Sequence, residues 1–356
     1  MTIRLRLLVP MSLLGGSMAA QQPTGGTETM RPPPISQAEL VRRMTTSLDS
    51  LAKVGQFSGV TVVAKNGVPI FQRAYGMADR ERGVANNSET AFNLGSINKV
   101  FTQIAILQLR DAGKLDLDST LAKYWPDYPN KEVARKITIR QLMRHTSGIG
   151  GNIFDPPAGG KRNDIRTLKD YLPLFVNEPL KFEPGARNAY SNAGYVVLGL
   201  LIERLSGDDY YTYVRAHIFT SAGMTRTGSF AVDSLPPNTA IGYTRGDEDA
   251  PLSAPLRANS RDLPGRGSSA GGGYSTAQDL LRFVQALREH RIPSGLPAGI
   301  GIAGGSGGMN AVVEGDLPGG YDMVVLANLD PPAAERVARM TREWLGVHED
   351  DGGGHR

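Results

Sequence analysis

The sequence predicts an α/β fold of the α+β type, in which helices flank an antiparallel sheet and an all-helical domain is inserted. Two observations carry this prediction. Strand-like segments lie near both ends of the chain, at 60–75 and 309–328, whereas the stretch 114–223 shows helical patterns and Pro-rich loops without a convincing strand. Strands from the two ends are expected to pair in one sheet, with the helical stretch packed beside it.

The N-terminal elements follow from short local signals. Ser36 begins a capping box, and apolar residues then recur on one helical face until Gly55. The β-rich segments 60–65 and 68–75 flank Asn66-Gly67, a strong hairpin signal. Pro69 places the second strand at a sheet edge or a bulge. The chain therefore opens with a helix followed by an antiparallel hairpin.

The rest of the chain alternates helices with loops. Residues 100–112 are apolar nearly all round and predict a buried helix. Arg245–Gly273 predicts a long loop, either at the surface near the functional site or disordered, and whether it closes over a cleft stays open. Strands at 309–314 and 321–328 are joined by a turn. Further helices are expected at 139–145, 167–177 with an interruption at Pro173, 194–205, 209–219, 276–289 and 332–344.

These elements suggest how the chain is divided. Residues 36–113 and 224–345 are expected to form a discontinuous sheet domain, and 114–223 the helical domain. Residues 21–35 are rich in Pro, Gly and Thr and predict a flexible leader, and 346–356 a disordered tail.

Residues 1–20 have the three parts of a secretory signal peptide. Residues 1–6 are positively charged, 7–14 are apolar and 17–20 are small. The apolar part is shorter than the roughly 20 residues that span a bilayer. We therefore expect an exported protein, periplasmic or secreted, without a stable membrane anchor.

The composition excludes several classes of protein. The 356 residues include 39 Lys and Arg against 35 Asp and Glu, a formal charge of +4, and 40% are hydrophobic. These values argue against bulk disorder and against a nucleic-acid partner. The absence of cysteine excludes disulfides, thiolate metal sites and a cysteine nucleophile. No His, Asp and Glu cluster has metal-ligand spacing, so we expect no metal and no cofactor. The composition leaves the oligomeric state open.

Two polar motifs could carry chemistry. Ser96 and Lys99 stand one helical turn apart, where a loop passes into the buried helix. A serine hydroxyl needs a base to become a nucleophile, and a desolvated lysine can supply one. Tyr190 and Asn192 precede another apolar helix; the phenol could move a proton, and the amide could orient a carbonyl. Each motif alone also fits an ordinary helix cap.

A glycine-rich segment, 302–308, precedes the strand at 309. Glycines allow a ligand to approach the backbone closely, although a flexible loop or a bulge has the same composition. Within it, 304–308 also matches the G-x-S-x-G pattern around Ser306, which marks a nucleophile in another hydrolase fold. That alternative requires a helix directly after the serine, and a strand is expected there. His145, beside Ser147, is more simply explained as a hydrogen-bonded structural histidine.

These motifs, in this order, resemble those of the serine β-lactamase-like superfamily. The superfamily includes penicillin-binding DD-peptidases, class C β-lactamases and β-lactamase-like carboxylesterases. The resemblance runs from about Phe57 to Trp344 and implies a β-lactamase/DD-peptidase-like fold. It also covers segments outside the motifs: 138–148, 182–185 with 190–195, 270–272 and 324–328.

The resemblance implies a role for each residue. Ser96 would be the nucleophile, Lys99 the group that activates it, and Tyr190 the partner base and proton donor. Which of Lys99 and Tyr190 takes the serine proton stays open. Asn192 would hold the substrate. The oxyanion hole would combine the Ser96 amide with an amide of the segment Gly304-Gly305, Gly305 in the preferred register.

The sequence departs from the family at Ile302, where relatives usually carry Lys or His. That cation would normally bind a substrate carboxylate. Loss of one charge-assisted hydrogen bond costs about 1.5–3 kcal/mol, which disfavours lactams and favours neutral esters or amides. The stretch 290–301 is short, and a strand usual in relatives could be missing.

We therefore predict an exported serine hydrolase that forms an acyl-enzyme and acts on a small ester, amide or peptide, with esters favoured. One alternative is a D-amino-acid peptidase, a DD-carboxypeptidase or a weak β-lactamase. An alternative of another class is a non-catalytic, penicillin-binding-like protein that senses peptidoglycan, which the lost cation at Ile302 would suit.

Overall fold

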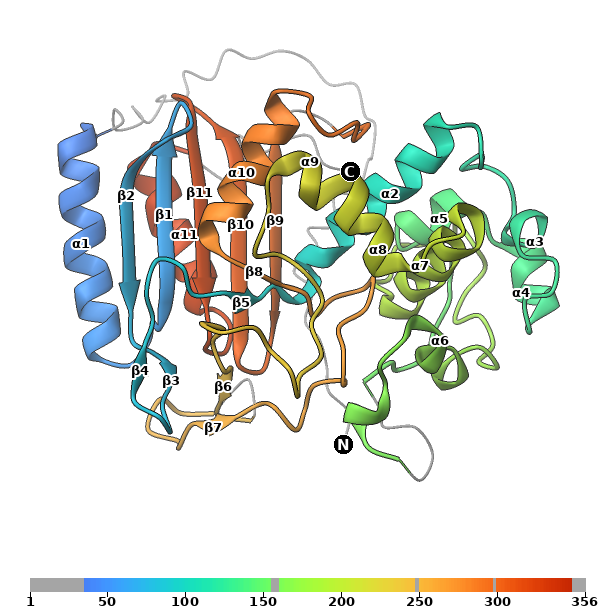
Figure 1. Cartoon of the computed structure of the whole chain (residues 1–356), viewed down its shortest axis with the longest axis horizontal. Helices are drawn as coiled ribbons and strands as arrows, with labels where there is room; N and C mark the ends of the chain where they lie inside the picture. Colours follow the sequence, from blue (N-terminus) through green and yellow to red (C-terminus); the bar gives the residue numbers. More distant parts are fainter. Residues whose placement is uncertain (1–34, 155–159, 247–249, 297–298, 348–356) are drawn as a thin grey trace, which may run out of the picture. The chain divides into compact units, whose positions relative to one another are not determined.

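A five-stranded antiparallel sheet with the order β2-β1-β11-β10-β9 lies at the centre of the fold (Figure 1). The computed structural model describes residues 35–154, 160–246, 250–296 and 299–347. The strands come from the N-terminal and the C-terminal parts of the described residues, as the sequence predicts. Their bounds are β1 Gly59–Lys65, β2 Val68–Tyr75, β9 Ile300–Ser306, β10 Met309–Leu317 and β11 Tyr321–Ala327.

The hairpin between β1 and β2 confirms its sequence signal. Asn66 and Gly67 both have positive φ angles, 50° and 79°, which is the backbone that an Asn-Gly hairpin turn requires. β2 is an edge strand, and the register shifts beside Pro69. Proline, which has no amide hydrogen, thus lies both at the edge and at a bulge.

Helices cover the two faces of the sheet. Side chains of a strand alternate between its faces, and accordingly Val62 and Val324 belong to one buried cluster, whereas Val63 and Val325 belong to the other. The first cluster contains residues of α10 (Ala277–Arg288) and α2 (Asn98–Asp111). The second contains residues of α1 (Gln37–Lys53) and α11 (Ala333–Trp344).

The sequence expectations for these four helices are confirmed. Ser36 caps α1 by accepting a hydrogen bond from the Glu39 amide at 3.2 Å. Thr276 caps α10 in the same way. α1, α10 and α11 each bury one apolar side against the sheet, as their periodicity predicts. α2 is instead buried on nearly all sides, as its apolar composition predicts, and packs against α7.

Between 114 and 223 the described residues form helices and loops and no strand beyond one bridge between Thr120 and Thr138. The long, buried α7 packs against α2 and holds this part together. The elements are α3 Leu121–Tyr124, α4 Lys131–Lys136, α5 Ile139–Met143, η2 Arg162–Asp164, α6 Leu168–Tyr171, η3 Leu172–Leu174, α7 Asn192–Ser206, α8 Tyr210–Val214, η4 Arg215–Phe219 and α9 Thr220–Ala222.

Within the described residues, three short ladders lie outside the main sheet. They are β3 Met77–Asp79 with β4 Val84–Ala85, β5 Phe92–Asn93 with β8 Tyr274–Ser275, and β6 Tyr243–Thr244 with β7 Arg257–Ala258. The described residues from 35 onward lie in one compact unit, so the division into a sheet domain and a helical domain stays a prediction.

Three sequence expectations need correction. The helix expected at 167–177 is interrupted at Pro173, as predicted, but it does not resume: α6 ends at Tyr171 and the 3₁₀ turn η3 ends at Leu174. The loop 245–273 is not wholly at the surface: Ser268, Ser269 and Ala270 are buried beneath α2 and α7.

The third correction concerns the glycine-rich segment. It is not a loop before a strand but is itself the edge strand β9, paired with β10 from Ile300 to Ser306. In the stretch 290–301 the described residues form a strand only where β9 begins, at Ile300, so the absence of a further strand before the glycine-rich segment stays a prediction. Glycine has low strand propensity, and the backbone hydrogen bonds to β10 supply what the side chains do not.

The predicted signal peptide, most of the leader and most of the tail lie outside the described residues. Ile35, which ends the predicted leader, donates its amide hydrogen to the Trp344 carbonyl. Gly346 and Val347, which begin the predicted tail, bond back to the last turn of α11.

Candidate active site

Ser96 lies in the 3₁₀ turn η1 (Gly95–Ile97), which leads directly into α2. Gly95 has φ 51°, a left-handed conformation that glycine adopts most easily. The turn is anchored on both sides, because the Asn93 side chain accepts the Gly95 amide hydrogen at 2.9 Å and Ile97 is buried in the core. The serine is thus presented at the start of a rigid, buried helix.

Lys99 lies one turn further along α2, with its side chain 7% exposed. Its Nζ lies 3.1 Å from Ser96 Oγ and 2.8 Å from Asn192 Oδ1, and it also donates to the Ala270 carbonyl. Burial disfavours the charged ammonium and lowers the pKa of Lys99 to about 7. A substantial fraction of this lysine is therefore uncharged at neutral pH.

Tyr190 and Asn192 reach the site from the beginning of α7. Ser191 caps this helix by accepting the Gly194 amide hydrogen at 3.0 Å, which fixes the residues on either side of it. The Tyr190 hydroxyl lies 2.6 Å from Ser96 Oγ, and Lys99 Nζ lies 4.7 Å from the centre of its ring. Burial raises the pKa of Tyr190, so the phenol keeps its proton at neutral pH.

The strand β9 forms the opposite side of the site. A Cβ atom added to Gly304 would lie 2.2 Å from the Leu94 carbonyl oxygen and 2.7 Å from the Ser96 amide nitrogen. A Cβ atom added to Gly95 would lie 2.9 Å from the Gly305 amide nitrogen. The backbones of η1 and β9 therefore pack so closely that neither glycine has room for a side chain.

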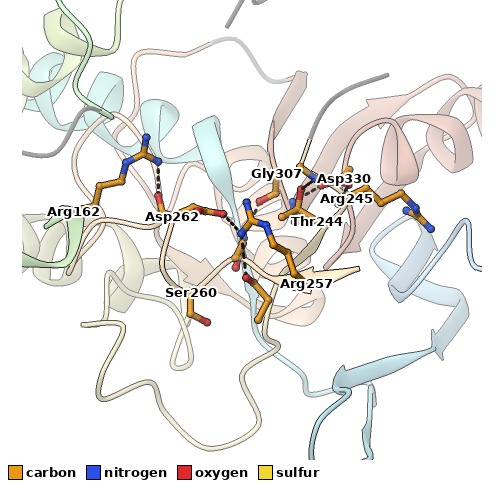
Figure 2. A network of polar contacts seen from close by, with 12 residues as sticks. Arg162, Thr244, Arg245, Arg257, Ser260, Asp262, Gly307 and Asp330 are labelled. Atoms are coloured by element: carbon orange, nitrogen blue, oxygen red, sulfur yellow. Dashed lines mark hydrogen bonds and ion pairs between the residues drawn. The ribbon is translucent and has the colours of Figure 1, made fainter. Parts of the chain in front are cut away.

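The tip of the β9–β10 hairpin is fixed by polar side chains, and Figure 2 shows the network around it. Asp330 accepts the Gly308 amide hydrogen at 2.7 Å with one carboxylate oxygen and the Arg245 amide hydrogen at 2.8 Å with the other. Asn259 donates to the Gly307 carbonyl at 2.8 Å. The position of β9 beside Ser96 thus depends on residues of the 245–273 segment.

The same network extends to the helical part of the chain. Arg257 pairs with the Asp262 carboxylate at 2.6 Å, and Arg162 donates to the Asp262 carbonyl at 2.9 Å (Figure 2). The 245–273 segment is consequently bonded both to the β9–β10 hairpin and to the helical part of the chain.

All the residues singled out from the sequence meet here. Ser96, Lys99, Tyr190 and Asn192 form one hydrogen-bonded group, and Gly304 and Gly305 lie against it. Their catalytic roles stay predictions. Sequence reasoning missed the Ala270 carbonyl as the third acceptor for Lys99; the run of small residues around Ala270 was the available signal.

The two rival serines do not have the surroundings that their chemistry requires. Ser306 lies in a β-hairpin and is exposed, and a strand follows it rather than a helix. Ser147 Oγ accepts the Ile149 amide hydrogen at 3.3 Å. His145 accepts the Ser191 amide hydrogen at 3.1 Å through Nδ1, which confirms the interpretation of a hydrogen-bonded histidine.

The described part of the chain holds no cluster of three or more acidic or histidine side chains that could bind a metal ion. Within the same residues, none of the helices combines the length and the apolar character needed to cross a membrane.

Comparison with known proteins agrees with this arrangement. The family model described as Beta-lactamase matches residues 46–347. The putative penicillin-binding protein PbpX of Bacillus subtilis is 33% identical over 258 residues, which are 72% of this chain and 61% of that protein. The esterase EstB of Burkholderia gladioli is 30% identical over 347 residues, covering 88% of this chain and 87% of the esterase.

Among solved structures, a penicillin-binding protein from Bacillus halodurans superposes with a TM-score of 0.71 at 31% identity. The match covers 82% of this chain and 98% of that one. An esterase and two penicillin-binding proteins thus each match between 72% and 88% of this chain.

Proposed function

The chain belongs to the beta-lactamase family of serine hydrolases, and from this premise we propose that it hydrolyses esters through an acyl-enzyme on Ser96. One observation carries the proposal: Ser96 Oγ lies within 3.1 Å of Lys99 Nζ and 2.6 Å of the Tyr190 hydroxyl. A hydroxyl with both a base and a proton donor in contact is the arrangement that acyl transfer needs.

Lys99 is the base for acylation in this proposal. Its pKa of about 7 lets the neutral amine take the Ser96 proton as Oγ attacks the substrate carbonyl carbon. Tyr190 is poorly suited to that step, because burial raises its pKa and keeps it protonated. The lowered pKa of Lys99 and the raised pKa of Tyr190 thus favour Lys99 as the base, a choice that the sequence leaves open.

Tyr190 then acts as the proton donor. When the tetrahedral intermediate collapses, the bond to the leaving alkoxide breaks, and the Tyr190 hydroxyl protonates that oxygen. The Lys99 ammonium returns a proton to Tyr190. In deacylation the neutral Lys99 amine takes a proton from water while the water oxygen attacks the acyl carbon. The Lys99 ammonium then gives that proton to Ser96 Oγ, which leaves as the hydroxyl.

The negative charge of the intermediate needs donors already in place. We assign these to the Ser96 amide, at the N-terminal end of a helix, and to the Gly305 amide of β9. The close packing of Gly95 and Gly304 across this gap supports the assignment. Asn192 accepts a hydrogen bond from Lys99 through Oδ1. In this proposal it thereby fixes the lysine and also orients the substrate carbonyl beside it.

Neutral esters are the substrate class that the site suits best. The sequence of β9 contains no Lys, Arg or His, and Ile302 is half-buried against the core. A substrate carboxylate therefore gains no cation from this strand. The esterase relative, matched over 87% of its length, supports the same choice.

Peptide or weak lactam hydrolysis is the second candidate, supported by the relative described as a putative penicillin-binding protein. The non-catalytic alternative is less well supported, because a sensor has no use for a lysine whose charge is suppressed beside a serine. We further propose export, from the charged, apolar and small segments of residues 1–20.

The test compares three substrates with the mature protein and its Ser96→Ala variant. We expect hydrolysis of a short-chain p-nitrophenyl ester, with activity lost in the variant, and much weaker hydrolysis of a chromogenic cephalosporin and of a D-alanyl peptide. A folded wild-type protein that leaves the ester intact would overturn the esterase proposal.

A further inference from the structure

One residue outside the reacting group holds the chain on both sides of Tyr190. The carbonyl of His145 accepts the Ala189 amide hydrogen at 2.9 Å, and its Nδ1 accepts the Ser191 amide hydrogen at 3.1 Å. The backbone immediately before and immediately after the tyrosine is therefore attached to His145.

The imidazole also supports the tyrosine ring directly. It stacks on Tyr190 with ring centres 4.5 Å apart and an interplanar angle of 28°, and it packs against Tyr195 at 5.0 Å. Tyr195 is itself fixed, because its hydroxyl accepts from Gln103 at 2.6 Å and donates to the Met143 carbonyl at 2.9 Å. The Tyr190 ring thus rests on a stack that cannot easily move.

The backbone at His145 is in a conformation that histidine rarely adopts. Its φ is 56°, in the left-handed region, which costs free energy for a residue with a large side chain. Such a conformation persists where the surroundings fix it, and it is concentrated at functional sites. Here it lets His145, two residues beyond the end of α5, bind the segment around Tyr190 with both its carbonyl and its ring.

The accepting bond through Nδ1 requires a particular protonation state. Nδ1 has a lone pair only when the proton of the neutral ring is on Nε2. Burial, together with the nearby Lys99, lowers the pKa of His145 to about 4. The ring is therefore neutral, and the bond to Ser191 intact, throughout the pH range in which Lys99 changes charge.

We propose that His145 is a positioning residue that holds the Tyr190 hydroxyl against Ser96 Oγ. This inference rests on the proposed role of Tyr190 as proton donor. His145 touches none of the reacting atoms in this account; it acts only through the tyrosine. Its loss should consequently lower the rate of the step that Tyr190 serves while changing substrate binding little.

The test is a double-mutant cycle with a simple alkyl ester, whose alkoxide leaving group needs a proton. His145→Gly removes the ring and relieves the backbone strain. His145→Asn tolerates the left-handed backbone and places an amide oxygen near the position of Nδ1. Both changes are made in the wild type and in Tyr190→Phe, with thermal unfolding as the control for folding.

We expect His145→Gly to lower kcat about ten- to a hundredfold with KM changed less than threefold, and His145→Asn to recover much of that loss. In the Tyr190→Phe background both changes should cost less than twofold. Equal losses in the two backgrounds, or wild-type kcat in a folded His145→Gly variant, would overturn the inference.

Two further results keep the inference separate from the proposal on which it rests. If Tyr190→Phe alone retains wild-type kcat on the alkyl ester, the assignment of Tyr190 fails, and with it the inference. If His145→Gly does not fold, His145→Asn carries the cycle, because it still removes the ring that stacks on Tyr190. A partial loss of kcat confined to the background that keeps Tyr190 supports the inference; an equal loss in both backgrounds, or wild-type kcat, contradicts it.

Discussion

Ser96 lies between two sides of the site that are built differently. The helix side, formed by α2 and the start of α7, presents Lys99, Tyr190 and Asn192 in direct hydrogen bonds, largely hidden from solvent. The strand side, formed by β9, presents backbone and small residues, and its chemistry-bearing atoms are amides. One side supplies groups that gain and lose protons, and the other supplies space and fixed dipoles.

Because the two sides of the site are built differently, mutations on the helix side and on the strand side should affect activity in different ways. On the helix side, a change removes a proton donor or acceptor and should act mainly through kcat, whatever the acyl group of the substrate. On the strand side, a change alters the fit or charge of what lies beside Ser96 and should act selectively. The predictions below separate these two behaviours.

The largest effect is expected for Lys99→Ala on the helix side. Removal of the base should lower kcat by about 10²- to 10⁴-fold for esters of any acyl length. Steady-state kinetics with a series of p-nitrophenyl esters measures this loss. A loss that varies strongly with acyl length would place Lys99 in substrate recognition instead.

Tyr190→Phe should separate the two proton-transfer roles. On an alkyl ester we expect a loss of about 10²-fold or more, because the alkoxide loses its proton donor. On a p-nitrophenyl ester the loss should be smaller, since nitrophenolate leaves without a proton.

The pH profile of the same variant identifies the base. Activity of the wild type should rise with pH through an apparent pKa near 7, as Lys99 loses its proton, and the variant should keep that limb. If the limb disappears with the phenol, Tyr190 rather than Lys99 is the base.

Gly304→Ala tests the close packing on the strand side. The added Cβ would meet the Leu94 carbonyl and the Ser96 amide, both backbone atoms, so the turn or the strand must shift. We expect kcat/KM to fall about ten- to a hundredfold. Gly301→Ala, in the same strand with nothing within 4 Å of its Cβ, is the matched control and should keep near-wild-type activity.

Ile302→Lys should reveal the selective behaviour of the strand side. A lysine here supplies the cation that the family resemblance leads us to expect at this position. One charge-assisted hydrogen bond of about 1.5–3 kcal/mol corresponds to roughly ten- to a hundredfold in kcat/KM. We expect kcat/KM for carboxylate-bearing substrates to rise by up to that factor while a neutral ester changes little. An equal change for both classes would contradict the assignment.

The smallest effect is expected for Ser306→Ala. This side chain is exposed at the end of β9, and the account gives it no part in the chemistry. Ester hydrolysis should stay within about twofold of the wild type. Loss of activity in a folded variant would instead support the G-x-S-x-G alternative, in which Ser306 is the nucleophile.

Elements with local signals could be predicted from the sequence. The Asn66-Gly67 hairpin, the Ser36 cap of α1 and the periodicity of α10 are set by neighbouring residues, and the structure has all three. The pairing of Ser96 with Lys99 belongs to the same class, because one helical turn brings them together.

Features that depend on main-chain hydrogen bonds rather than on residue type could not be predicted in this way. The strand β9 forms because β10 offers its hydrogen bonds, although its own glycines argue against a strand. The Ala270 carbonyl reaches Lys99 across 171 residues of sequence, and the run of small residues around Ala270 does not indicate which carbonyl faces the lysine. The two hydrogen bonds by which His145 holds the backbone on either side of Tyr190 could not be predicted for the same reason, since one of them is made by the His145 main-chain carbonyl.

The central claim is that Ser96 carries the acyl group, and peptide mass spectrometry tests it most directly. The protein is mixed with excess p-nitrophenyl acetate, quenched in acid during turnover and digested, and Ser96→Ala is treated in parallel. We predict one acetyl group on the peptide that contains Ser96, absent from the variant. An acetyl group on another residue, with turnover retained in Ser96→Ala, would contradict the account.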